Sequence, residues 1–537
     1  MAFARRTALS LAFAAVAGLG IWSAAAPASA ETVLKRGIGS TIGTLDPQVN
    51  FLAYEAWIQD DMYEGLVTPG ADGEPIPGAA EKWDISDDGL TYTFHLRDGL
   101  KWSDGSPLAA QAFVDSVART LDPATASEKN YIFSSTISIA GAADYMSADN
   151  KGPRDPKTLG ISAPDDKTVV IKLDKPAPYM LYLMNSFYVA PLHKPSLEAH
   201  GKDFVKPEFI VSNGAYHMSE SVPQSHVTLV KNPNYWNAAN VKIDKVTYVI
   251  TEDDSTAVKL FKAGDQDITY DIPSDQIDPL KKEFGDQVHV TNSTETVYFS
   301  FNLKKPPFDN AKVRAALSMA IDRDTLVNKV VKGGYVVSCG YVIPIPTYDA
   351  PKVPECGMDK AARVAKAKEL FKEGMAEAKM DKLSLKIEST ANASSKKIAE
   401  TAAVMWKQTL GVDAKVNAQD RDAWLAVFTA GTWDVFGDDL VGDFAGPETF
   451  LSYMDPRAEA GYNWVSQEYS DLLDKAMLVT DQAERYKVLA QAEKVLLDSY
   501  LTAPIAAAPS RSLVRSDVKG WIDNPAGWHG TQFMSMQ

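Results

Sequence analysis

Strands and helices alternate along two long parts of this sequence, and that alternation limits the folds open to it. In the first part, the pattern predicts a strand at 246–250, a helix at 257–263 and a strand at 267–270. The second part begins with a strand at 297–302 and a helix at 311–321, and the alternation continues from there. A strand, a crossover helix and a second strand form a parallel pair, so we predict an α/β protein with mixed sheets.

A segment of different character lies ahead of both parts. Residues 69–77 are rich in Gly, Pro and Asp, and the following residues alternate between apolar and polar, most clearly at 91–96 and 168–173. We therefore predict an antiparallel unit inserted at 69–190. The first lobe combines 31–68, 191–296 and 501–537, and the second lobe covers 297–500.

The amino terminus has the pattern of a secretory signal peptide. Arg5 and Arg6 precede an apolar run, and Ala28-Ser29-Ala30 places small residues before a cleavage point. A retained membrane anchor fits less well, because glycines interrupt the run and the cleavage signal follows it directly. We expect residues 1–30 to be removed and the mature protein to lie in the periplasm.

The charge of the mature chain restricts its partners. Removing Arg5 and Arg6 from the 54 Lys and Arg leaves 52 against 70 Asp and Glu, a net charge of −18. This charge disfavours nucleic acids and anionic membrane surfaces as partners, and it is compatible with cationic or zwitterionic ligands.

The chain contains two cysteines, Cys339 and Cys356. In an exported protein, such a closely spaced pair predicts a disulfide that closes a proline-rich loop, although two free thiols remain the alternative. Two ligands are too few for a structural zinc site.

A single acidic residue stands out in the stretch 433–451. An apolar, strand-like run ends in Gly442-Asp443-Phe444, and no Lys or Arg lies within the stretch. A carboxylate placed there is poorly solvated and favours a nearby cation. Asp443 either caps the next turn, pairs with a distant Arg, or binds a cation carried by a ligand.

The usual catalytic motifs are missing. No two of the seven histidines have the spacing of a zinc protease, and the sequence contains no GxSxG elbow and no phosphate-binding Walker loop. The SxxK motif at Ser394 is too short to indicate a nucleophile, and we interpret it as a helix cap. An extracellular hydrolase remains the third alternative, because scattered catalytic residues escape sequence analysis.

Several stretches together resemble one family, the extracellular solute-binding proteins of peptide importers, which include the oligopeptide- and dipeptide-binding proteins. They occur in the family's order along nearly the whole mature chain: Tyr63-Glu64-Gly65-Leu66, the residues 92–97 with 101–105, Asn213-Gly214-Ala215-Tyr216, the residues 231–236, and Phe301-Asn302 with 306–317.

The resemblance implies two lobes that close on a ligand, a third domain inserted into the first lobe, and delivery of the ligand to a membrane ABC permease. It also places Asp443 where peptide-binding members hold the α-ammonium of the ligand. We expect a monomer without a cofactor or bound metal. The candidate ligand-binding residues are Asp443, Arg421, Glu55, Tyr131, Phe133, Trp424 and Phe444.

The sequence also departs from the family. Leu440-Val441-Gly442 stands where peptide-binding members often have Trp-Cys, so the disulfide between Cys339 and Cys356 would be a local alternative. Arg421 replaces an aromatic residue of the cleft; it either pairs with Asp420 or Asp422 at the surface or binds a ligand carboxylate. Because relatives carry opines, nickel chelates, haem or sugars, a non-peptide solute is the second hypothesis after a peptide.

Overall fold

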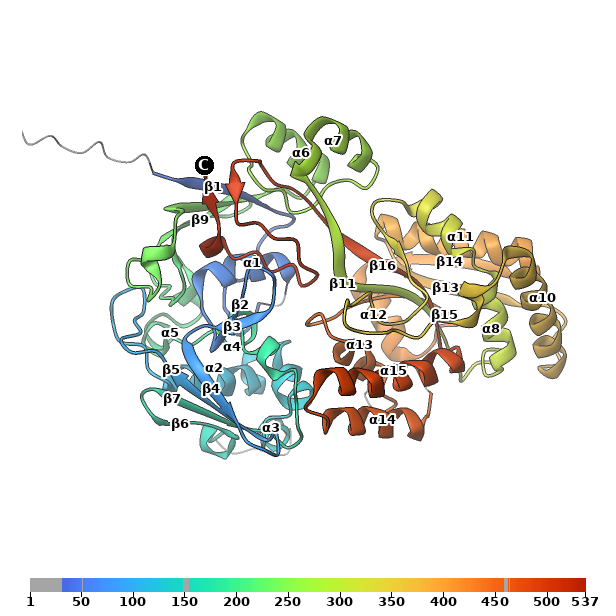
Figure 1. Ribbon diagram of the computed structural model, residues 1–537, viewed down its shortest axis with the longest axis horizontal. Coiled ribbons are helices and arrows are strands. Elements are labelled where there is room, and N and C mark those ends of the chain that lie inside the picture. The colour runs from blue at the N-terminus through green and yellow to red at the C-terminus, as the bar shows by residue number, and fades with distance from the viewer. Residues whose placement is uncertain (1–30, 51, 148–153, 458–461, 463) are drawn as a thin grey trace, which may run out of the picture.

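The computed structural model describes residues 31–50, 52–147, 154–457, 462 and 464–537 (Figure 1). The expected signal peptide, residues 1–30, lies outside the described residues. Among those described, no helix is both long enough and apolar enough to cross a membrane.

The first of three main sheets contains four strands in the order β1-β10-β9-β8. The sheet is partly parallel, as predicted, but the partner of β10 is β1 and not the segment 267–270, while β8 and β9 form an antiparallel hairpin. We call the part built on this sheet lobe I. The bounds are Val33–Ile38 (β1), Tyr216–Val222 (β8), His226–Lys231 (β9) and Lys245–Ile250 (β10).

The second sheet has six strands in the order β12-β16-β11-β15-β13-β14, and the part built on it is lobe II. Strands β14, β13 and β15 are parallel, whereas β11 is antiparallel to both β15 and β16. The bounds are Val288–Phe301 (β11), Val336–Val337 (β12), Ser384–Thr390 (β13), Asp413–Gln419 (β14), Val435–Val441 (β15) and Thr502–Leu513 (β16).

The third sheet is antiparallel, as predicted, with the order β4-β5-β7-β6, and we call the part built on it the inserted unit. Its strands are Ala80–Ile85 (β4), Thr91–Leu96 (β5), Ile161–Asp165 (β6) and Thr168–Lys172 (β7). Two small pairs complete the strands: Val67–Pro69 (β2) with Pro75–Pro77 (β3), and Val518–Lys519 (β17) with Ser535–Met536 (β18).

Helices surround these sheets, and Figure 1 shows that α8, α10 and α11 gather beside the six-stranded sheet while α13, α14 and α15 lie below it. The bounds are Ala53–Met62 (α1), Gln111–Leu121 (α2), Ala142–Met146 (α3), Ser186–Val189 (α4), Lys194–His200 (α5), Asp254–Ala263 (α6), Ile277–Phe284 (α7), Ala311–Ala320 (α8), Arg323–Thr325 (α9), Lys360–Glu377 (α10), Ala393–Leu410 (α11), Arg421–Ala430 (α12), Pro447–Tyr453 (α13), Gln467–Met477 (α14) and Gln482–Ser499 (α15).

Two long strands connect the lobes. β11 and β16 run side by side from the region of α6 and α7 into the six-stranded sheet (Figure 1). Their pairing contains an irregularity between Asn292 and Thr296, at the point where the two strands pass between the lobes. Such a bulge bends a strand and redirects its side chains.

One predicted strand is wrong. Residues 267–270 form isolated bridges, in which Ile268 pairs with Arg36 on one side and Val514 on the other, and they do not form a strand. Beside these bridges the carboxylate of Asp267 accepts the backbone N–H of Lys35, at 2.8 Å.

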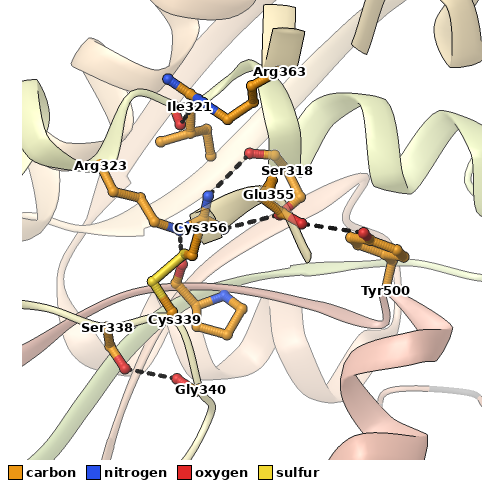
Figure 2. The surroundings of a disulfide bond; sticks show 11 residues. Ser318, Ile321, Arg323, Ser338, Cys339, Gly340, Glu355, Cys356, Arg363 and Tyr500 are labelled. Carbon is orange, nitrogen blue, oxygen red and sulfur yellow. Dashed lines mark hydrogen bonds and ion pairs between the residues drawn. A yellow bond between two sulfur atoms is a disulfide. The ribbon is translucent and has the colours of Figure 1, made fainter. Parts of the chain in front are cut away.

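The predicted disulfide between Cys339 and Cys356 is present. It lies beside a buried cluster in which Glu355 accepts hydrogen bonds from Ser318 (2.6 Å) and Tyr500 (3.1 Å), as Figure 2 shows. Arg323 forms an ion pair with the same carboxylate at 3.5 Å. The bridge closes the loop, and Glu355, the residue before Cys356, links it to the start of α9 and the end of α15 within lobe II.

Candidate ligand site between the lobes

The loop that follows β15 connects the two lobes. Phe444 is buried between Tyr179 and Tyr182, and its ring stacks on theirs at centroid distances of 5.1 and 5.4 Å. It thereby belongs to the hydrophobic core of the inserted unit, although its strand belongs to lobe II. Gly442 makes the turn possible, since a Cβ there would lie 2.7 Å from the Thr449 side chain and 2.9 Å from the Phe450 ring.

Asp443 lies in this loop, where lobe II meets the inserted unit. Its Oδ1 accepts hydrogen bonds from the hydroxyls of Tyr131 (2.8 Å) and Tyr188 (3.0 Å). Among the described residues it forms no ion pair, so the expected alternative of a distant Arg is not observed. Gly446 rather than Asp443 occupies the cap position of α13.

The surroundings of Asp443 disfavour the ionised form of its carboxyl group. Burial raises the pKa of this carboxyl, and the hydrogen bonds from Tyr131, Tyr188 and Thr449 oppose the rise. The two phenols respond in the opposite sense, because burial and the adjacent carboxylate raise the pKa of both. The hydroxyls therefore remain donors, and the carboxylate keeps unmet capacity for a cation.

A strand edge leads up to this carboxylate. β15 pairs with β11 along its whole length, but β13 covers its opposite edge only at Val435 and Phe436. The hydrogen bond from Gly442 N–H to Thr294 C=O fixes the alternation of the ladder. The backbone groups of Asp439 and Val441 therefore point away from β11, toward an edge that no described strand pairs with.

Two further carboxylates stand beside this edge. Glu295 is the β11 partner of Val441, and burial together with the charge of Asp439 raises its pKa to about 8, while Arg511 opposes the shift. Burial likewise raises the pKa of Asp439, and the positive charge of Arg421 lowers it. Each of these carboxylates thus has one arginine whose charge opposes the effect of burial.

Arg421 is the first residue of α12, and its side chain is exposed. Asp420 caps the helix by accepting the N–H of Ala423, at 3.0 Å. No ion pair joins Arg421 to Asp420 or Asp422 among the described residues, so the alternative of a local surface pair is not observed. Its electrostatic partner is Asp439, beside the open strand edge.

The other predicted ligand-binding residues differ in how deeply they are buried. Trp424 faces the same edge, because its indole N–H donates to the carbonyl of Gly437 at 3.3 Å. Glu55 is buried and accepts the backbone N–H groups of Gly43 and Thr44. Phe133 is fully buried in the core of the inserted unit. Ligand contact by Glu55 and Phe133 therefore stays a prediction.

Sequence analysis missed three aromatic residues of this site: Tyr179, Tyr182 and Tyr188. A signal was present, since the segment 179–188 holds four aromatic residues among apolar ones. Nothing in the local pattern connects them with Asp443, which lies 255 positions after Tyr188.

A small open pocket borders the loop, between lobe II and the opposite side. Asp443 and Phe444 line it from lobe II, and Thr68, Tyr182 and Trp528 line it from the opposite side. Its charged lining residues are all acidic: Asp72, Glu74 and Asp443. Within the described part of the chain, no group of three or more His, Cys, Asp or Glu side chains is arranged to hold a metal ion.

Comparison with known proteins gives consistent matches. Residues 74–462 match the model of the bacterial extracellular solute-binding proteins, family 5. The periplasmic oligopeptide-binding protein OppA of Escherichia coli is 33% identical over 498 residues, which cover 91% of this chain and 90% of the relative.

Solved structures agree with the sequence matches. The murein tripeptide-binding protein MppA of Escherichia coli superposes with a TM-score of 0.80 at 32% identity, covering 95% of this chain and 99% of that one. OppA of Haemophilus influenzae, in complex with the peptide RPPGFSPFR, gives a TM-score of 0.78 at 30% identity, covering 94% and 99%.

Proposed function

This chain belongs to family 5 of the bacterial extracellular solute-binding proteins, and from that premise we propose that it is the periplasmic binding component of an ABC importer. It binds a peptide between lobe I and lobe II and delivers it to a membrane permease. The chain is a carrier and performs no chemistry on its ligand. It acts as a monomer after removal of residues 1–30.

The observation that carries this proposal is the position of Asp443 at the end of an open strand edge. A carboxylate that receives only hydroxyl hydrogen bonds, from Tyr131, Tyr188 and Thr449, takes a charged donor well, and a peptide's α-ammonium supplies it. The backbone groups of Val441 and Asp439 then pair with an extended ligand, which adds a strand to the six-stranded sheet.

The direction of the ligand follows from these two contacts. With its amino end at Asp443, the peptide runs back along β15 and is antiparallel to it. Residues opposite Val441 and Asp439 pair through the backbone, and the ligand residue between them faces the other side of the sheet. Recognition through the main chain tolerates many side chains, so length and termini set the preference.

Arg421 provides the second anchor in this arrangement. A short peptide that starts at Asp443 ends near Asp439, the carboxylate on which the charge of Arg421 acts. The guanidinium exchanges this partner for the ligand's terminal carboxylate. Two charged anchors favour peptides of about three residues, since each residue of a strand spans about 3.3 Å.

Isothermal titration calorimetry with di- to pentapeptides, an opine and nickel salts tests the proposal. We expect the tightest binding for a tripeptide with free termini, and no heat from nickel or the opine. Mass spectrometry of ligand copurified from the periplasm gives an independent answer. A copurified opine or metal chelate, together with no binding of any peptide, would replace the peptide with a non-peptide solute.

The alternative that the chain is a hydrolase is tested with the same mixtures of protein and peptide. We expect the peptide to be recovered intact after prolonged incubation with the protein. Shorter peptides in the product analysis, absent from a control without protein, would make the chain an enzyme.

A further inference from the structure

Lys129 is a fully buried lysine in the inserted unit, close to the two tyrosines that bind Asp443. Its ammonium donates three hydrogen bonds, to the carbonyl of Pro47 (3.1 Å), the side-chain oxygen of Asn50 (2.9 Å) and the carbonyl of Phe187 (2.5 Å). It also lies 3.8 Å from the centroid of the Phe187 ring. All three donors of the ammonium are therefore used.

No carboxylate forms an ion pair with this ammonium among the described residues. Asp46 is held by Arg119 through two short contacts, and Glu55 is used by the backbone of Gly43 and Thr44. Burial lowers the pKa of Lys129, and the charges of Asp46 and Glu55 act in the opposite direction. A buried cation held by neutral oxygens costs stability relative to an apolar side chain that fills the same space.

The three acceptors explain what this arrangement accomplishes. Lys129 precedes Tyr131 by two residues, and its acceptor Phe187 directly precedes Tyr188. Pro47 and Asn50 belong to the segment that leads into α1. One ammonium thus fixes its own segment, which carries Tyr131, relative to the segment of Phe187, which carries Tyr188, and both segments belong to the inserted unit.

We propose that Lys129 is a positioning residue of the ligand site, which sets the spacing of the Tyr131 and Tyr188 hydroxyls around Asp443. This proposal rests on the proposed function, because the geometry matters only if Asp443 binds the ligand's ammonium. Both hydroxyls donate to the same oxygen of Asp443, so a small displacement of either segment removes a bond and changes where the carboxylate points.

The test compares a tripeptide with its N-acetylated form in the full mature protein. The ratio of their dissociation constants measures recognition of the ammonium, and a purely structural residue leaves this ratio unchanged. We expect Lys129→Met to reduce the ratio by about tenfold or more, as loss of a supporting residue does around other ordered sites. Asn50→Ala, which removes one of the three acceptors, should reduce it less.

Arg314→Met is the matched control. Arg314 is also a buried cation that donates to backbone carbonyls, those of Phe308, Ser499 and Tyr500, but it lies in lobe II away from Asp443. We expect this variant to lower the melting temperature while the ratio stays at the wild-type value.

The tyrosines provide the decisive comparison. In a Tyr131→Phe, Tyr188→Phe background, Lys129→Met should cause no further change in the ratio, because its effect passes through the two hydroxyls. If wild type and both Lys129→Met and Asn50→Ala give the same ratio, Lys129 is only a structural residue, although the proposed function stands. If the wild-type protein itself fails to discriminate against acetylation, the role of Asp443 is wrong, and with it this proposal.

Discussion

Two acidic side chains show how differently this protein treats a buried carboxylate. Glu355, beside the disulfide, is 1% exposed and satisfied within its own lobe by Arg323, Ser318 and Tyr500 (Figure 2). Asp443 is half-buried and receives only neutral hydroxyls, those of Tyr131 and Tyr188 from the inserted unit and that of Thr449 from its own lobe.

This difference separates stability from binding. A carboxylate whose cation belongs to the protein contributes to the fold, and its loss leaves a buried charge unpaired. A carboxylate without a protein cation gains its partner from outside, so its loss affects the ligand. Glu448, which pairs with Arg485 at 2.7 Å, belongs with Glu355 in the first class, although it lies only five residues after Asp443.

The largest change in stability is expected for Arg323→Met. This substitution leaves Glu355 buried without its cation, so the free energy of unfolding should fall by about 3 to 5 kcal/mol. Urea denaturation followed by circular dichroism measures this loss. Peptide affinity, determined at a temperature where the variant is folded, should equal that of the wild type. A comparable loss of affinity would contradict the distinction between carboxylates that stabilise the fold and the carboxylate that binds the ligand.

Removing the disulfide is expected to have the next largest effect. Cys339 and Cys356 are 17 positions apart, and a crosslink of that span stabilises by about 3 kcal/mol through the entropy of the unfolded chain. The double variant Cys339→Ser, Cys356→Ser should lose that amount in urea denaturation and should bind peptide normally. Labelling of both cysteines by a thiol reagent in the denatured, unreduced wild-type protein would contradict the bridge itself.

The acid dependence of affinity sharpens the comparison. Burial raises the pKa of Asp443, so the ligand-free site gains a proton as the pH falls through that raised pKa, and a protonated carboxyl no longer pairs with an ammonium. Affinity should be complete above the raised pKa and should fall by up to about tenfold per pH unit below it.

The matched variant identifies the titrating group. In Asp443→Asn this part of the pH profile should disappear. An unchanged acid limb in Asp443→Asn would assign the dependence to another residue.

The smallest effect is expected at Arg421. Amidation of the carboxyl end of the best tripeptide should weaken binding by about threefold to fivefold, a loss of up to about 1 kcal/mol, because the guanidinium is exposed to solvent. In Arg421→Ala the penalty for amidation should largely disappear in calorimetry. If the variant retains the whole penalty, Arg421 belongs to the solvated surface.

Much of the fold was predictable, because the responsible signals are local. The apolar run before Gly442 predicted the strand that ends at Asp443, and the spacing of the two cysteines predicted their bridge. The predicted strand at 267–270 was wrong because only Ile268 pairs there, with partners more than 200 positions away. Strand propensity carries no information about how many residues of a segment find a pairing partner.

The site was only half predictable for a similar reason. A carboxylate without a nearby cation is visible in the sequence around Asp443, and Tyr131 was among the predicted candidates, but the contacts of the Tyr131 and Tyr188 hydroxyls with Asp443 span 312 and 255 positions. Their contribution depends on how the lobes close, and so does the stacking of Phe444. Long-range packing of this kind leaves no periodic pattern in a sequence.

The central claim is that Asp443 binds the amino end of a peptide, and a cycle of two changes tests it most directly. Calorimetry compares a tripeptide and its N-acetylated form in the wild type and in Asp443→Asn. We expect acetylation or the substitution alone to cost about 3 to 5 kcal/mol of binding free energy, and both together to cost little more than either. Equal acetylation penalties in the two proteins would contradict the claim.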